Sequence, residues 1–309
     1  MVSIEELIDF ALKNDCSDIH LDGTLPVIFR RMGKLVQSHF ELGEEGTEKL
    51  ILSLLTERRR ERLADGADLD FSFECLSGRQ WVNVYRQKNR LCAAIRILSR
   101  ETPTLEDLGL PQVLGTLDEE PRGLVLVTGH TGSGKSTTFA AMIDRINQRR
   151  SAHIITIEDP IEYVYNHGNS MIHQREIGAD VGSFAAALRS AMREDPDVIL
   201  VGEMRDYETI AAAVTAAETG HLVLSTLHTT GAAQTLDRII DVFPPHSQGQ
   251  IRSQMAGVLK GIITQTLIPR ADGTGRVAAA EILVGTDAVL SLIREGKNHQ
   301  IPSMMQAGG

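Results

Sequence analysis

The chain has 309 residues, a formal net charge of −10 and a hydrophobic content of 42%. That length suits two globular domains with separate cores. The acidic balance argues against a general polyanion binder, because neutralising phosphates needs a basic face, and no nucleic-acid partner is expected. Three scattered cysteines without C-x-x-C spacing indicate a reducing compartment rather than a disulfide framework or a cysteine zinc site.

No apolar run approaches the ~18–20 residues that cross a bilayer. The N-terminus, MVSIEELIDF, is too acidic for a signal peptide. The sequence therefore predicts a cytoplasmic protein, and any association with a membrane is expected to come through a partner.

The first hundred residues have a mixed α+β pattern. Ser3 and Glu6 form a capping box that opens a helix. Strands are predicted at 17–22 and 27–33, and one helix rich in Leu and Arg at about 44–64. Alternating segments then predict three antiparallel strands, DLDFSFEC, RQWVNVYRQ and LCAAIRIL. Residues 1–98 are predicted to be a small α+β domain.

The pattern changes after residue 98. Residues 99–121 contain three prolines and are predicted to be a linker with one short helix. Continuous apolar runs follow, typical of parallel strands buried on both faces, at 124–129, 153–158, 197–203 and 221–227. Helical segments lie between these runs, one of them capped by Ser183. Residues 122–309 are therefore predicted to be a doubly wound α/β domain with its ligand at the carboxyl ends of the strands.

A phosphate-binding loop lies between the first of these strands and the next helix. The segment GHTGSGKS, residues 129–136, matches the pattern G-x-x-x-x-G-K-[ST]. Its glycines let backbone N–H groups turn toward phosphate oxygens, and the helix N-terminus favours anions. Lys135 is expected to reach the β- and γ-phosphates, and Ser136 to ligate Mg²⁺. The predicted nucleotide-binding residues are Gly129, Thr131, Gly132, Ser133, Gly134, Lys135, Ser136 and Thr137.

Carboxylates follow the next two strands. Glu203 ends the third strand and is expected to hold Mg²⁺ through water. Glu158, Asp159 and Glu162 come just after the second strand, where acids are costly unless a metal or an attacking water needs them. Glu162 is the candidate for polarising that water.

Two histidines flank the fourth strand. His221 precedes it and His228 follows it. At ~3.3 Å per residue they lie roughly 20 Å apart, too far to share one metal ion. His228 is expected at the γ-phosphate, and His221 at the opposite edge, against another element or subunit.

Taken together, these segments resemble the type II/type IV secretion ATPase superfamily, most closely the type IV pilus retraction ATPases. The similar segments are SDIHL, TGHTGSGKSTT, ITIEDPIEY, DPDVILVGEMRD and AAETGHLVLSTLHT, in that order. Near the end, DAVLSLIREGK, with Arg294 and Glu295, is a partial match to the C-terminal retraction motif of that family. The resemblance covers nearly the whole chain.

The resemblance implies a RecA-like ATPase domain preceded by a PAS-like domain, assembled into a homo-hexamer. It implies that Lys135 and Ser136 bind Mg-ATP, that Glu162 is the catalytic base and that Glu203 is the Walker B acid. It also implies that His221 and His228 are both needed for activity. The implied partners are an inner-membrane pilus platform protein and the pilus machinery.

Family members also bring arginines from the N-terminal domain to the triphosphate, and Arg96 matches one of them. Where relatives have Arg-Phe-Arg-Val-Asn, this chain has RQWVN, so Trp81 stands in place of a second arginine. The loss of that arginine matters unless Arg79 or Arg86 substitutes for it. The family pattern also continues past residue 309, and the chain is expected to be truncated relative to it.

Several functions remain open at this point. The leading hypothesis is a motor that hydrolyses ATP to drive pilus retraction. The alternatives are an assembly or secretion ATPase of the same superfamily, an accessory retraction paralogue, and an ATP-binding regulator with little turnover, which Trp81 motivates. The acidic balance argues against a RecA-like DNA motor.

Overall fold

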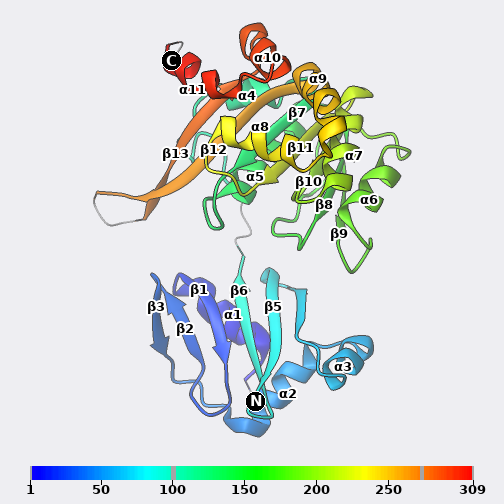
Figure 1. The fold of residues 1–309 in the computed structure, drawn as a ribbon. Helices are drawn as coiled ribbons and strands as arrows, with labels where there is room; N and C mark the ends of the chain where they lie inside the picture. The colour runs from blue at the N-terminus through cyan, green and yellow to red at the C-terminus, as the bar shows by residue number, and fades with distance from the viewer. Residues whose placement is uncertain (1, 99–101, 272–274, 308–309) are drawn as a thin grey trace. The chain divides into compact units, whose positions relative to one another are not determined.

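The computed structural model describes residues 2–98, 102–271 and 275–307, with the side chain of residue 307 excepted. The chain divides into two compact units. One comprises Met1–Glu101 with Pro160–Val164, and the other comprises Thr102–Asp159 with Tyr165–Gly309. Residues 99–101, which begin the predicted linker, lie outside the described residues (Figure 1).

The first unit contains a six-stranded antiparallel sheet of order β3-β2-β1-β6-β5-β4. Its strands are β1 (Cys16–Leu21), β2 (Ile28–Arg31), β3 (Lys34–Gln37), β4 (Leu69–Cys75), β5 (Gly78–Gln87) and β6 (Arg90–Ile97). Its helices are α1 (Ile4–Lys13), α2 (Gly43–Ser53) and α3 (Glu57–Ala64). The Ser3–Glu6 capping box is confirmed, since each side chain bonds the other residue's backbone N–H.

The single helix predicted at about 44–64 is wrong, because α2 and α3 are separate. Thr56, the residue before α3, has extended backbone with φ −69° and ψ 161°. Leu54 and Leu55 are both buried between the two helices. A residue in this extended conformation cannot continue a helix, so α2 ends before Thr56 and α3 begins after it.

The second unit is built on a seven-stranded sheet of order β13-β12-β7-β11-β10-β8-β9. All neighbouring pairs are parallel except β12 and β13. The strands are β7 (Gly123–Thr128), β8 (His153–Glu158), β9 (Met171–Glu176), β10 (Val198–Val201), β11 (Leu222–Leu227), β12 (Leu259–Pro269) and β13 (Arg276–Val284).

Helices cover both faces of this sheet (Figure 1). They are α4 (Leu114–Leu117), α5 (Lys135–Arg149), α6 (Phe184–Ala191), α7 (Tyr207–Glu218), α8 (Ala232–Asp241), α9 (Gln248–Val258), α10 (Asp287–Arg294) and α11 (Ile301–Ala307), with short 3₁₀ turns at Pro245–Ser247 and Asn298–Gln300. Ser183 caps α6 as predicted. The RecA-like α/β class predicted for this part of the chain is confirmed.

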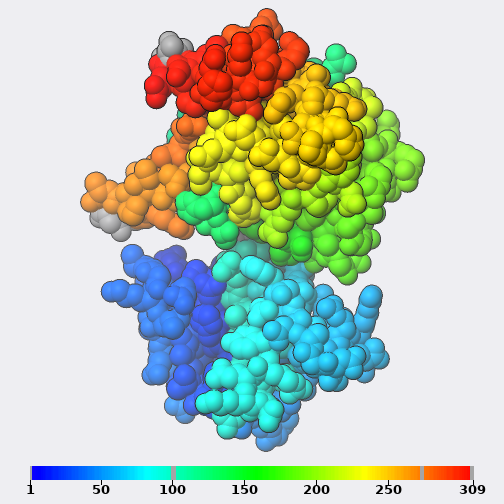
Figure 2. All heavy atoms as spheres, viewed as in Figure 1, coloured from blue at the N-terminus to red at the C-terminus, as the bar shows by residue number. Residues whose placement is uncertain are grey.

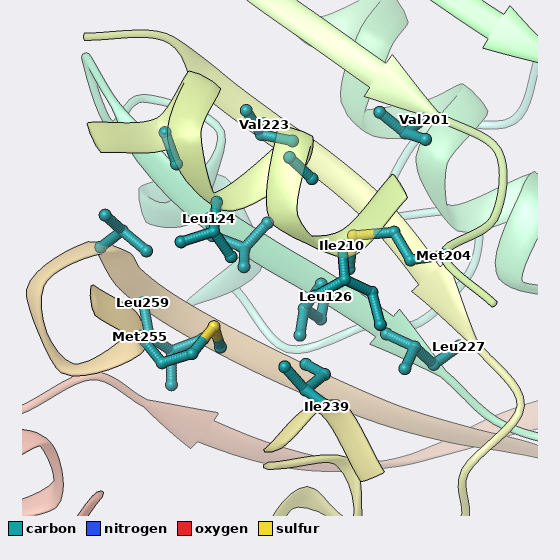
Figure 3. Packing of buried hydrophobic residues seen from close by; sticks show 14 of the residues in the cluster. Leu124, Leu126, Val201, Met204, Ile210, Val223, Leu227, Ile239, Met255 and Leu259 are labelled. Carbon is teal, nitrogen blue, oxygen red and sulfur yellow. The ribbon is translucent and has the colours of Figure 1, made fainter. Parts of the chain in front are cut away.

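Side chains of β7 alternate between two cores. Leu124 and Leu126 pack with α7, α8 and α9 on one face, as Figure 3 shows for Ile210, Ile239 and Met255. Val125 and Val127 pack on the other face with α5. Every residue of β7 is buried, so the strand is continuous apolar sequence rather than an alternating pattern.

The sequence predicted four strands of this sheet and missed β9, β12 and β13. β9 is an edge strand with the polar sequence MIHQRE, which carries little strand signal. β12 begins directly after α9 without a turn residue, and its second half is largely exposed.

The helices α8, α9, α10 and α11 lie next to one another over one region of the surface of this unit (Figure 2).

The segment predicted as a linker is packed where the structure describes it. Leu105, Leu110, Leu114 and Leu117 are buried in the same core as α5. Arg145 of α5 also donates hydrogen bonds to the Asp118 carboxylate and to the Gly115 carbonyl. Residues 102–121 therefore cover one face of the second sheet.

Candidate nucleotide site

The loop between β7 and α5 has the backbone that a phosphate cradle requires. Gly129, Gly132 and Gly134 have φ values of 143°, 79° and 91°, in the range that favours glycine. A Cβ on Gly129 would stand 2.3 Å from the Gln265 carbonyl oxygen, so no side chain fits there. Conformation favours glycine at all three positions, and space also excludes a side chain at Gly129.

Lys135 is the first residue of α5 and is 9% exposed. Its Nζ donates hydrogen bonds to the carbonyl oxygens of Gly129 and His130, at 2.8 and 3.0 Å. The ammonium group is therefore held over the loop itself. Ser136 and Thr137 follow in the first turn of the helix.

Glu203 and His228 come from neighbouring parallel strands, β10 and β11, at the edge where β7 enters the loop. His228 Nε2 lies 3.1 Å from Glu203 Oε1. Arg205 Nε donates a hydrogen bond to the same oxygen. The structure thus brings together the acid and the histidine predicted for this edge.

A cavity of about 480 Å³ opens at this edge. Its lining includes Thr131 of the loop, Glu203, His228 and Thr229, together with Arg205 and Arg238. Three strand ends therefore face one space that contains a carboxylate, an imidazole and guanidinium groups. Thr226, near the end of β11, is buried and donates a hydrogen bond to the Gly202 carbonyl at 2.6 Å.

The pKa of His228 is lowered from its ordinary value of 6.5. Burial is the largest cause, and the positive charge of Lys135 is the next; Glu203 acts in the opposite direction. The imidazole is therefore neutral at pH 7 and can both donate and accept a hydrogen bond.

His221 lies at the other end of β11, as predicted. Its Nδ1 lies 2.9 Å from the Ala216 carbonyl oxygen, in the last turns of α7. Gly123, the first residue of β7, donates its N–H to the His221 carbonyl. The structure therefore separates His221 from the phosphate loop and from His228.

The three acids predicted after β8 have different surroundings. Glu158 is 9% exposed and accepts hydrogen bonds from Thr156 and Gln174. Asp159 is exposed and is the last residue of the segment Thr102–Asp159 of the second unit. Glu162 is exposed and belongs to the segment Pro160–Val164, which groups with the first unit. Glu158 is therefore buried at the end of β8, whereas Asp159 and Glu162 are exposed.

The remaining predicted residues lie on elements of their own units. In the first unit, Arg96 Nε lies 3.3 Å from Asp18 Oδ1, and its guanidinium stands 5.2 Å from the ring centre of Trp81. Arg79, on the adjacent strand, donates a hydrogen bond to Ser72. In the second unit, Arg294 ends α10, and Glu295 pairs with Lys297 at 2.7 Å, which lowers the pKa of that carboxyl group.

Arg205 and Gln265 are functional candidates that the sequence patterns did not predict. Arg205 follows Glu203 by two residues, and the turn after β10 brings their side chains together. Gln265 is a lone amide within the apolar run GIITQTLI, at a position that is 3% exposed. A polar residue at a strand position whose neighbours in the pattern are buried could have indicated a specific hydrogen-bonding role for Gln265.

Within residues 2–98, 102–271 and 275–307, no group of three His, Cys, Asp or Glu side chains is arranged to hold a metal ion. Over the same residues no helix is long and apolar enough to span a membrane.

A glycine loop between a buried parallel strand and a helix, with acids at the next strand ends, defines a P-loop ATPase of RecA-like fold. The profile of the family described as type II/IV secretion system protein matches residues 2–306. The chain belongs to this family.

Three comparisons show how similar its relatives are. The chain is 46% identical to the type IV pilus retraction ATPase PilT of Pseudomonas aeruginosa, over 100% of this chain and 90% of that protein. It is 44% identical to the uncharacterized protein YggR of Escherichia coli, over 99% and 94%. A crystal structure of the pilus retraction motor PilT with bound ADP superimposes with a TM-score of 0.95 at 49% identity, covering 99% of this chain and 90% of that one.

Proposed function

We propose that the chain is a motor ATPase that converts ATP and water to ADP and phosphate to drive retraction of a type IV pilus. The observation that carries this proposal is the Glu203–His228 contact of 3.1 Å, in a cavity that Thr131 of the phosphate loop also lines. A loop that only binds nucleotide does not require an acid–imidazole pair beside it. The proposal is supported by the similarity to PilT over the whole chain.

In this proposal the loop Gly129–Ser136 binds the phosphates through its backbone N–H groups, and Thr137 extends the contact along α5. Lys135 neutralises charge on the β- and γ-phosphates. The hydroxyl of Ser136 and the carboxylate of Glu203 fit Mg²⁺, because both present the oxygen ligands that this ion prefers, Glu203 through water. The metal ion, when bound, neutralises charge that develops on the phosphate oxygens.

Glu162 accepts the proton of the attacking water in this proposal. His228, neutral at pH 7, has a single N–H, which in this proposal shifts from Glu203 to the transferred phosphate when nucleotide binds. Arg96, supplied by the N-terminal domain, neutralises the phosphate on the opposite side. Glu158 and Asp159 shape the acidic turn that leads to Glu162. His221 acts outside the nucleotide site, by holding the end of α7 against β7.

We further propose that residues 1–98 and 122–309 are the two working domains, joined through residues 99–121, and that six copies form a ring. Contacts to the γ-phosphate from both domains are made with ATP and lost after hydrolysis, which drives domain rotation. The ring acts at the inner face of the cytoplasmic membrane on the pilus platform protein, and Arg294 and Glu295 belong to the surface that transmits the motion.

Lys135→Ala tests the nucleotide site. Removal of the ammonium group should abolish Mg-dependent phosphate release, since the charge of the β- and γ-phosphates is left unbalanced. The measurement is steady-state ATPase activity of the purified chain over a range of protein concentrations. Unchanged activity in this variant would defeat the assignment.

The cellular role needs a separate test. Deletion of the gene should give cells with excess surface pili and no twitching motility, and wild-type chain should restore both properties while Lys135→Ala should not. Cells without pili would instead indicate an assembly ATPase.

A further inference from the structure

Gln265 of β12 bonds both the phosphate loop and the first turn of α5, which lie about 130 residues before it in the sequence. Its side-chain Nε2 donates a hydrogen bond to the Ser133 carbonyl at 2.8 Å. Its Oε1 accepts a hydrogen bond from Thr138 Oγ1, also at 2.8 Å. One buried amide thus uses both ends on the loop and on the first turn of α5.

The main chain of β12 also limits the loop at this point. The Gln265 carbonyl oxygen lies 2.3 Å from where a Cβ on Gly129 would stand. The side-chain Nε2 of Gln265 lies 2.7 Å from the corresponding position on Gly134. Gln265 therefore contacts the loop at its first glycine and at the glycine just before the helix.

Such contacts matter because glycine-rich segments lose more conformational entropy on ordering than other segments. Within the loop, the Ser133 N–H bonds the His130 carbonyl at 3.2 Å, and Lys135 bonds the carbonyls of Gly129 and His130. These bonds are local. The bonds of Gln265 tie the same loop to a strand of the central sheet, which fixes the angle at which the chain leaves the loop and enters α5.

We propose that Gln265 is a positioning residue of the nucleotide site, which sets nucleotide affinity by holding the phosphate loop in its binding conformation. This inference rests on the proposed function, in which the loop binds Mg-ATP. Gln265 acts through Ser133 and Thr138 rather than on the nucleotide itself. Because loop order is needed for any phosphate ligand, ATP and ADP are affected alike.

The test compares Gln265→Met with the wild-type 309-residue chain. Methionine keeps the approximate volume of the side chain and removes both hydrogen bonds. The Kd values for Mg-ATP and Mg-ADP should each rise about tenfold, whereas kcat at saturating ATP should change less than threefold. Isothermal titration well below the melting temperature of both proteins measures the affinities of folded molecules.

Asn147→Leu is the matched control. Asn147 is also a buried amide and lies on α5, where Nδ2 donates to the Asn166 carbonyl and Oδ1 accepts from the Gly168 N–H. Its contacts fix a loop distant in sequence from residues 129–136. Both variants should lower the melting temperature, but only Gln265→Met should weaken nucleotide binding.

Gln265→Glu gives a second readout and covers the case in which the methionine variant fails to fold. A protonated glutamic acid can donate to the Ser133 carbonyl, whereas the carboxylate repels it. Burial raises the pKa of such a group, so the affinity ratio of wild type to variant should grow as pH rises from 6 to 8.

Equal nucleotide affinities in the wild type and the folded Gln265 variants, or an equal loss in Asn147→Leu, would overturn the inference. Failure of the wild-type chain to bind Mg-ATP would instead overturn the proposed function.

Discussion

The two ends of β11 carry the same residue type in different surroundings. At the amino end, His221 Nδ1 contacts the Ala216 carbonyl and so belongs to the packing of α7 against the sheet. At the carboxyl end, His228 contacts Glu203, and the positive charge of Lys135 helps to lower the pKa of the His228 imidazole. Six buried residues separate them.

The difference shows that strand direction determines the role of each histidine. In a parallel sheet all carboxyl ends meet at one edge, so residues that follow β7, β10 and β11 converge on one cavity. The amino ends face helix C-termini, where polar side chains complete backbone hydrogen bonds. The two edges should therefore respond differently to substitution.

The largest effect is expected for Glu203→Gln at the carboxyl edge. The substitution removes the negative charge that orients Arg205 and His228 and that is proposed to hold the hydration shell of Mg²⁺. We expect kcat to fall about 100-fold, the upper end for an outer-shell metal partner, with ATP binding retained. Steady-state phosphate release and equilibrium ATP binding measure the two effects.

Glu218→Gln serves as the control for that substitution. Glu218 ends α7 on the amino side of the sheet, and its exposed carboxylate accepts a hydrogen bond from Gln254. The kcat of the Glu218→Gln variant should stay within about twofold of wild type, since a polar contact at the surface contributes little to stability. Equal losses in both variants would mean that the two edges are not functionally distinct.

A smaller effect separates the two histidines themselves. His228→Gln should lower kcat about tenfold, equivalent to roughly 1.4 kcal/mol of barrier. His221→Gln removes a hydrogen bond to Ala216 and should lower the free energy of unfolding by about 1 kcal/mol, with a smaller loss of kcat. Denaturant unfolding and ATPase assays on the same preparations give both quantities. A stable His221 variant as inactive as His228→Gln would contradict this distinction.

The smallest effect is a pH dependence of a few-fold that belongs to His228. The folded protein holds the pKa of His228 below 6.5, so the imidazole is neutral above that value and gains a proton only as pH falls through the lowered pKa. Activity should therefore be level from pH 7 to 8 and decline at acid pH. The unfolded chain takes up this proton first, so acidification also lowers stability.

The check is the pH profile of kcat for wild type and His228→Gln at saturating Mg-ATP. The variant should lack the acid decline that His228 causes. Identical profiles would assign the titration to another group.

Sequence alone was sufficient for the central features because they depend on local chemistry. The phosphate loop follows from fixed glycines, and β7, β8, β10 and β11 follow from continuous apolar runs. The position of Glu203 and His228 at one edge follows from the parallel topology that those runs indicate.

The rest depends on contacts distant in sequence. The edge strand β9 is polar, Thr56 adopts an extended backbone between α2 and α3, and Gln265 meets Ser133 through pairing of β12 with β7. No periodicity within a short window encodes such pairings. The proposed role of Glu162 as the catalytic base also does not follow from its place after β8 alone, because the segment that contains it groups with the first unit.

The most direct test of the account is a structure of the chain with Mg²⁺ and a non-hydrolysable ATP analogue. In that structure, backbone N–H groups of residues 129–136 should surround the β-phosphate, with Lys135 Nζ and the Glu203–His228 pair within hydrogen-bond reach of the terminal phosphate or its metal shell. Nucleotide bound elsewhere, or His228 turned away from the terminal phosphate, would contradict it.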